Sequence, residues 1–116
     1  MTLRMYHNPR CGTCRTTLSL LREAGEEPDI IEYLETPPTT AELDTLCTKL
    51  KLEPRALVRF REGRAKELGL KASDERPRSE WLKLLAENPV LIERPIVVKG
   101  DKARLCRPAE RVKELL

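Results

Sequence analysis

The sequence contains no apolar run close to the ~20 residues that a membrane-spanning helix needs, so we expect no membrane segment. The start of the chain leads directly into a strand-like stretch and does not resemble a signal peptide. There is no basic block with interleaved aromatic residues, and the net charge is only +3, which argues against a nucleic-acid-binding protein. We therefore expect a cytoplasmic protein.

Metal ligands are also scarce. His7 is the only histidine, and Cys47 and Cys106 are isolated, whereas a zinc site needs a second pair of ligands at regular spacing. We therefore expect no bound metal.

The Cys-x5-Arg motif of phosphatase-like enzymes is absent, because Thr17 stands six residues after Cys11. In a reducing cytoplasm, the four cysteines indicate chemistry or core packing and not a disulfide framework.

The hydrophobic pattern and the turn residues predict an α/β protein. The expected elements are a strand at Leu3–Tyr6, a helix at about Thr13–Ala24, a strand at Asp29–Leu34, a helix capped by Thr39 and ending near Leu50, a short helix within Pro54–Phe60, a polar and broken stretch at Gly63–Arg78, a helix at Ser79–Glu87, strands at Ile96–Lys99 and Ala103–Cys106, and a last helix from Pro108 to Leu116. This order predicts a single domain over residues 1–116, a thioredoxin-like mixed sheet with flanking helices and a helical insertion in the middle of the chain.

Cys11 is the strongest candidate for chemistry. It lies in the turn between the first strand and the first helix, where unpaired N–H groups and the helix dipole favour a thiolate and can also bind an anion. Arg10 and His7 are close in sequence, and either cation could lower the pKa of the thiol further. The alternatives are that Cys11 is a small buried residue and that His7 is a structural hydrogen-bonding residue.

Cys14 completes a Cys-Gly-Thr-Cys pattern at the start of the same helix. This spacing brings two sulfurs within reach of a disulfide, as in redox CxxC motifs. Alternatively, Cys14 packs inward with Leu18 and Leu21, which lie one and two turns further along. Cys47 fits a helical core pattern, and Cys106 is either core or a second thiol near the site.

Arginine carries the basic excess, with 14 Arg against 8 Lys, and its planar guanidinium suits oxyanions. Further signals lie in the segments Tyr6–Thr13, Tyr33–Thr39, Arg55–Arg59, Glu67–Leu70, Pro89–Val98 and Arg104–Pro108. Together these segments resemble the glutaredoxin-coupled arsenate reductase family. They span nearly the whole chain, so the resemblance implies one arsenate reductase-like domain with a thioredoxin-like fold.

The resemblance also implies roles for individual residues. Cys11 would attack arsenate and form a thiolate–arsenic adduct, and Arg59, Arg94 and Arg107 match the three oxyanion-binding arginines of the family. Pro95 matches the position of the cis proline beside the catalytic cysteine. Glutathione, as co-substrate, and glutaredoxin would resolve the adduct and release arsenite. No bound cofactor is implied, and we expect a monomer.

Two other hypotheses follow from the same residues. A regulator of the Spx type would use Cys11 and Cys14 as a redox switch and would bind RNA polymerase instead of turning over a substrate. A general thiol oxidoreductase would reduce disulfides without needing the three arginines. Within the arsenate reductase hypothesis, Cys14 is a possible resolving thiol that would form an internal disulfide with Cys11.

Overall fold

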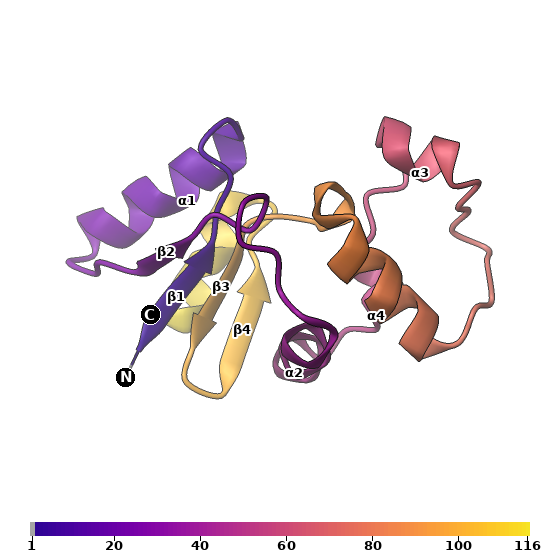
Figure 1. The fold of residues 1–116 in the computed structure, drawn as a ribbon. Coiled ribbons are helices and arrows are strands. Elements are labelled where there is room, and N and C mark those ends of the chain that lie inside the picture. Colours follow the sequence, from indigo (N-terminus) through magenta and orange to yellow (C-terminus); the bar gives the residue numbers. More distant parts are fainter. Residues whose placement is uncertain (1) are drawn as a thin grey trace. The chain divides into compact units, whose positions relative to one another are not determined.

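The computed structural model describes residues 2–116, which divide into two compact units (Figure 1). The sheet unit consists of Met1–Thr36 and Arg94–Leu116, and the helical unit consists of Pro37–Glu93. The helical unit is therefore an insertion between the second and third strands of the sheet. No helix among residues 2–116 is long and apolar enough to cross a membrane.

The sheet unit contains a mixed four-stranded sheet in the order β2-β1-β3-β4. Its strands are β1 (Leu3–Tyr6), β2 (Asp29–Ile31), β3 (Ile96–Lys99) and β4 (Lys102–Leu105). β1 and β2 are parallel, and helix α1 (Gly12–Glu23) connects them. β3 is antiparallel to both β1 and β4. Because β1 lies between β2 and β3, the loop at its C-terminal end begins next to the ends of both neighbouring strands.

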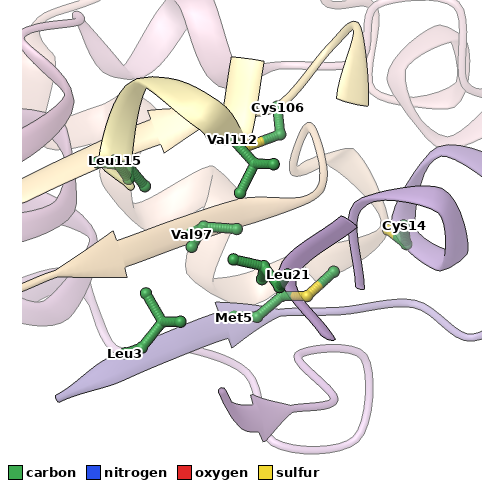
Figure 2. Close-up of a cluster of buried hydrophobic side chains, with 8 residues drawn as sticks. All are labelled: Leu3, Met5, Cys14, Leu21, Val97, Cys106, Val112 and Leu115. Atoms are coloured by element: carbon green, nitrogen blue, oxygen red, sulfur yellow. The ribbon is translucent and has the colours of Figure 1, made fainter. Parts of the chain in front are cut away.

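The core of the sheet unit lies between the sheet and two helical segments, α1 and the C-terminal 3₁₀ helix η3 (Ala109–Leu115). Figure 2 shows the side chains that meet there: Leu3, Met5, Cys14, Leu21, Val97, Cys106, Val112 and Leu115. Alternation along β1 sends Leu3 and Met5 to the same face of the sheet. This packing fixes α1 and so determines where its N-terminus lies.

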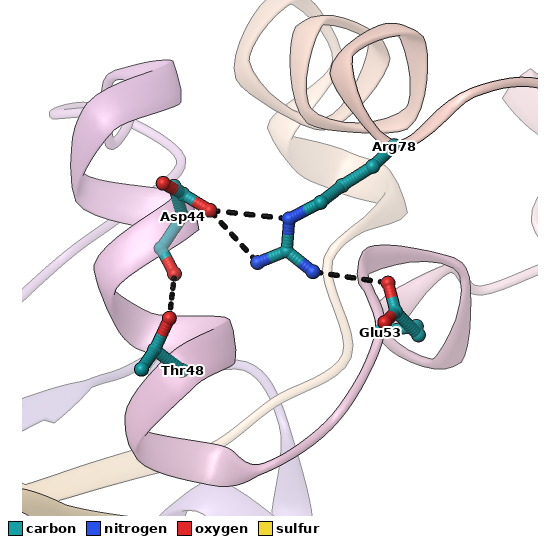
Figure 3. A network of polar contacts seen from close by, with 4 residues as sticks. All are labelled: Asp44, Thr48, Glu53 and Arg78. Carbon is teal, nitrogen blue, oxygen red and sulfur yellow. Dashed lines mark hydrogen bonds and ion pairs between the residues drawn. The ribbon is translucent and has the colours of Figure 1, made fainter.

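The helical unit contains α2 (Thr40–Leu50), η1 (Pro54–Leu57), α3 (Gly63–Glu67), α4 (Arg78–Glu87) and η2 (Pro89–Leu91). Thr39 caps α2, since its side-chain oxygen accepts a hydrogen bond from the Glu42 backbone N–H at 3.1 Å. Arg78, at the start of α4, bonds Asp44 of α2 at 2.8 Å and Glu53 at 2.9 Å (Figure 3). These ion pairs link three segments of the unit.

The predicted α/β class and most of the predicted elements are confirmed, but two details were wrong. The strand predicted at Asp29–Leu34 ends at Ile31, where the hydrogen bond from the His7 N–H is the last one to the β1 segment. The stretch Gly63–Arg78, expected to be broken, begins with helix α3. The short helix predicted within Pro54–Phe60 and the last helix are both present, and both are 3₁₀ helices.

Candidate active site

The loop after β1 positions Cys11. The Asn8 side-chain oxygen accepts a hydrogen bond from the Arg10 backbone N–H at 3.0 Å, and the Asn8 carbonyl accepts one from the Cys11 N–H at 2.9 Å. This closed turn leaves Cys11 as the N-cap of α1 in an extended conformation, with φ −91° and ψ 123°. The sulfur therefore faces the first turn of the helix, where backbone N–H groups point outward.

The electrostatic environment of Cys11 favours its thiolate. Burial has the largest single effect on the pKa of this thiol and raises it. Hydrogen bonds from the Cys14 backbone N–H, the Arg94 guanidinium and the Cys14 thiol outweigh that effect. The net result lowers the pKa of Cys11 from 9.0 to about 6. A partly exposed thiol of this kind is ionised at neutral pH and is nucleophilic.

Cys14 lies one turn further along α1 and is fully buried in the core of the sheet unit. Burial, together with the neighbouring Cys11 sulfur, raises the pKa of the Cys14 thiol to about 12. Cys14 thus packs inward and also contacts Cys11. The two interpretations of this residue from the sequence are therefore compatible.

Two arginines from the C-terminal part of the chain lie beside Cys11. Arg107 Nη1 is 3.9 Å from the Cys11 sulfur, and it also donates a hydrogen bond to the Arg94 carbonyl at 2.9 Å. Arg94 hydrogen-bonds to Cys11, and its Nε is buried without a hydrogen-bond partner among residues 2–116. The Arg94–Pro95 peptide is cis, as the family resemblance implied, and the Arg107–Pro108 peptide is also cis.

Arg59 belongs to the helical unit, where two carboxylates flank its guanidinium. Glu62 Oε1 is 3.5 Å from Nε, and Glu93 Oε2 is 3.5 Å from Nη1. The side chain is only 10% exposed. Its backbone N–H donates to the Leu91 carbonyl at 2.7 Å, which joins the two segments that carry Arg59 and Glu93. The sequence identified Arg59 but gave no sign of these two carboxylates.

His7 and Arg10 lie in the same loop, but neither is among the groups that act most strongly on the pKa of Cys11. His7 is buried, and its backbone N–H donates to the Ile31 carbonyl at 2.9 Å. Burial lowers the pKa of His7, which disfavours the imidazolium. Arg10 is exposed. Their role in tuning Cys11 stays a prediction.

Arg15 is a residue that the sequence analysis missed. Its Nη1 donates a hydrogen bond to the Pro9 carbonyl at 2.9 Å, so it ties α1 to the loop that carries Cys11. The only signal in the sequence was a basic residue four positions after Cys11, on the adjoining turn of the same helix.

The other two thiols are core residues. Cys47 and Cys106 are buried, and burial raises their pKa to about 11 and about 12, respectively. The Cys106 sulfur contacts the Arg104 carbonyl at 3.6 Å. Among residues 2–116, no three His, Cys, Asp or Glu side chains are grouped so that they could hold a metal ion.

The arrangement combines a thiolate nucleophile, the N-terminus of a twelve-residue helix and two guanidinium groups. The helix N-terminus and the guanidinium groups attract an oxyanion and stabilise charge on its oxygens. The thiolate can attack the central atom of an oxyanion bound there. The site therefore suits nucleophilic attack on a small, multiply charged oxyanion.

Comparisons with known proteins agree with this geometry. A family model described as ArsC family matches residues 6–115. The arsenate reductase of Escherichia coli K12 is 47% identical over 112 residues, which cover 97% of this chain and 79% of that protein. The arsenate reductase of Rhizobium meliloti is 44% identical over 116 residues, which cover 100% and 82%. The solved structure of an arsenate reductase from Vibrio cholerae superposes with a TM-score of 0.94 at 44% identity, covering 100% of this chain and 98% of that one.

Proposed function

Because the chain belongs to the ArsC family, we propose that it is an arsenate reductase, an oxidoreductase that converts arsenate to arsenite through a covalent adduct on Cys11. The observation that carries the proposal is the lowered pKa of Cys11 beside Arg94 and Arg107. A thiol without this setting would be largely protonated at neutral pH and would be a poor nucleophile for an anion.

The first step follows from this geometry. Arsenate binds with its oxygens toward the guanidinium groups of Arg94 and Arg107 and toward the N-terminus of α1. The Cys11 sulfur attacks arsenic, an As–S bond forms and an As–O bond breaks. The displaced oxygen leaves as water, with its protons supplied by the bound hydrogen arsenate and by solvent. The arginines hold the negative charge that would otherwise repel the thiolate, so their main contribution is to stabilise charge in the transition state.

Arg59 is proposed as the third oxyanion-binding arginine, on the basis of its match to the family pattern. Glu62 and Glu93, each 3.5 Å from its guanidinium, limit the rotamers that this side chain can adopt. A fixed guanidinium loses less conformational entropy when it binds an anion. The two carboxylates also partly neutralise the guanidinium. They therefore lower the free-energy cost of burying its positive charge in a side chain that is only 10% exposed.

The two electrons come from glutathione with glutaredoxin, and the reaction takes place in the cytoplasm, where such thiols are kept reduced. The proposal calls for a single copy of the chain, because Cys11, Arg94 and Arg107 meet within one protomer. It calls for no resident metal or cofactor, since the thiolate supplies the nucleophile.

A coupled assay tests the function. Purified protein, glutathione, glutaredoxin and glutathione reductase are mixed with NADPH, and NADPH oxidation is followed with and without arsenate. We expect arsenate-dependent oxidation that disappears in Cys11→Ser. The Cys106→Ala variant, which removes a buried thiol, should stay active. No arsenate-dependent turnover by folded protein with a titratable Cys11 would contradict the proposal.

A further inference from the structure

Cys11 and Cys14 form a contacting pair of unequal thiols at the start of α1. Cys11 is partly exposed, whereas Cys14 is fully buried one turn further along the helix. Figure 2 shows Cys14 with the other members of the buried cluster of the sheet unit. The partly buried Cys11 packs against this cluster. Both the backbone N–H and the thiol of Cys14 donate hydrogen bonds to the Cys11 sulfur.

The backbone of this turn allows the two sulfurs to bond. Residues three apart within a helix have Cβ atoms about 5–6 Å apart, whereas a disulfide needs about 3.5–4.5 Å. Cys11 is the extended N-cap and not a helical residue, so its side chain can turn toward the helix. Cys11 packs against the buried cluster that contains Cys14, and each thiol shifts the pKa of the other, so the two side chains are neighbours.

The two thiols also differ in protonation: Cys11 can attack as a thiolate at once, whereas Cys14 becomes a nucleophile only as the arsenic adduct takes its proton. Cys11, with its lowered pKa, is the thiolate that meets the substrate. Cys14 keeps its proton, because burial raises its pKa, and the core shields it from dissolved thiols and oxidants. Because the core separates Cys14 from solvent, the neighbouring Cys11 sulfur is the reactive group within its reach.

We propose that Cys14 is a second catalytic residue, a resolving thiol that attacks the arsenic-bearing Cys11 sulfur and so releases arsenite by forming a Cys11–Cys14 disulfide. This inference rests on the proposed function. It assigns the first reduction step to the chain itself, and glutathione with glutaredoxin then reduces the protein disulfide.

The step balances. The Cys14 sulfur bonds to the Cys11 sulfur as the Cys11 S–As bond breaks. The electron pair of that bond stays on arsenic, which passes from the pentavalent to the trivalent state. The Cys14 proton moves to an oxygen of the departing arsenite. The two thiols together lose two electrons and become a disulfide, so one arsenate is consumed for each disulfide formed.

Single-turnover chemistry without added thiols tests the inference. The reduced protein is freed of reductant under an inert atmosphere, and excess arsenate is added. Arsenite is then quantified, and the disulfide is mapped by mass spectrometry of peptides from the unreduced protein. We expect arsenite in an amount equal to the protein and a Cys11–Cys14 disulfide in the same amount.

Matched variants distinguish a resolving role of Cys14 from a purely structural role. Cys14→Ser keeps a hydrogen-bond donor to Cys11, and we expect it to release no more arsenite in this assay than Cys11→Ser. Cys14→Ala serves as a second variant should the serine disturb the core. Cys106→Ala removes another buried thiol of the same cluster and should behave like the unchanged protein.

Each outcome decides the matter. Arsenite released without thiols by the Cys14 variants as well as by the unchanged protein would overturn the inference. Arsenite that appears only when glutathione and glutaredoxin are added would also overturn it, while the proposed function would stand. No arsenite under either condition would overturn both. The measurement on the unchanged protein is decisive even if neither Cys14 variant folds.

Discussion

Arg107 Nη1 lies 3.9 Å from the Cys11 sulfur, although the two residues are 96 positions apart in the chain. The antiparallel pairing of β1 with β3, and of β3 with β4, brings the segment that follows β4 to the loop that follows β1. The same guanidinium donates to the Arg94 carbonyl at 2.9 Å, so it also fixes the backbone beside a second arginine. The predictions below test this site and the fold that supports it.

The reactivity of Cys11 should follow a pKa of about 6. Its rate of alkylation by iodoacetamide should rise about tenfold per pH unit below that value and then level off, because the thiolate is the reacting form. The rate is measured from acidic to mildly alkaline pH, with Cys11→Ser as the control for labelling of the buried thiols. A midpoint near the ordinary value of 9.0 would contradict the assigned environment.

Replacement of Arg94 by alanine should impair both the nucleophile and the oxyanion site. The pKa of Cys11 should rise, because the Arg94 guanidinium is one of the groups that lower it. We also expect kcat/KM for arsenate to fall about 10²-fold or more, the usual effect of removing one donor to a developing charge.

The Arg107→Ala variant provides the comparison. Loss of the Arg107 guanidinium should lower kcat/KM for arsenate by a similar factor. It should shift the pH midpoint of Cys11 alkylation less than loss of Arg94 does, because the 3.9 Å contact of Arg107 with the sulfur is long. Equal shifts in the two variants would show that the arginines do not differ in this way.

His7 should make the folded protein less stable in acid. Its pKa is lowered from 6.5 in the folded state, mainly by burial, so the unfolded chain binds more protons as pH falls through 6.5. Above pH 6.5 His7 is neutral in both states and does not favour unfolding. As the pH falls below 6.5, protonation of His7 in the unfolded chain lowers the free energy of unfolding. Urea unfolding at neutral and mildly acidic pH measures the effect, and His7→Gln should flatten the pH dependence. Ring signals that titrate above 6.5 in an NMR experiment would contradict this expectation.

Removal of the cap of α2 should destabilise the helical unit. Thr39→Ala deletes the oxygen that accepts the Glu42 N–H at 3.1 Å, and we expect a loss of about 1 kcal/mol in the free energy of unfolding. For a domain of this size the Tm should fall by about 4 °C. Thr40→Ala, at the next position, which is also exposed, is the matched control. If both variants lost the same stability, the cap would not be the cause.

The sequence determined the features that depend on neighbouring residues. The apolar strand Leu3–Tyr6, the cap formed by Thr39 and the position of Cys11 at the start of a helix are all local signals, and each agrees with the structure. Their physical basis is the side-chain period of strands and helices, together with unpaired N–H groups at helix ends, which act over a few residues.

Only the tertiary structure decided the features that depend on distant residues. β2 ends at Ile31, where the hydrogen bond from the His7 N–H is the last one to the β1 segment, and α3 forms where the sequence is merely polar. The hydrogen bond of Arg94 to Cys11 and the contact of Arg107 with it arise from strand pairing, which periodicity does not reveal. Burial and nearby charge set the thiol pKa, and the folded chain alone supplies both.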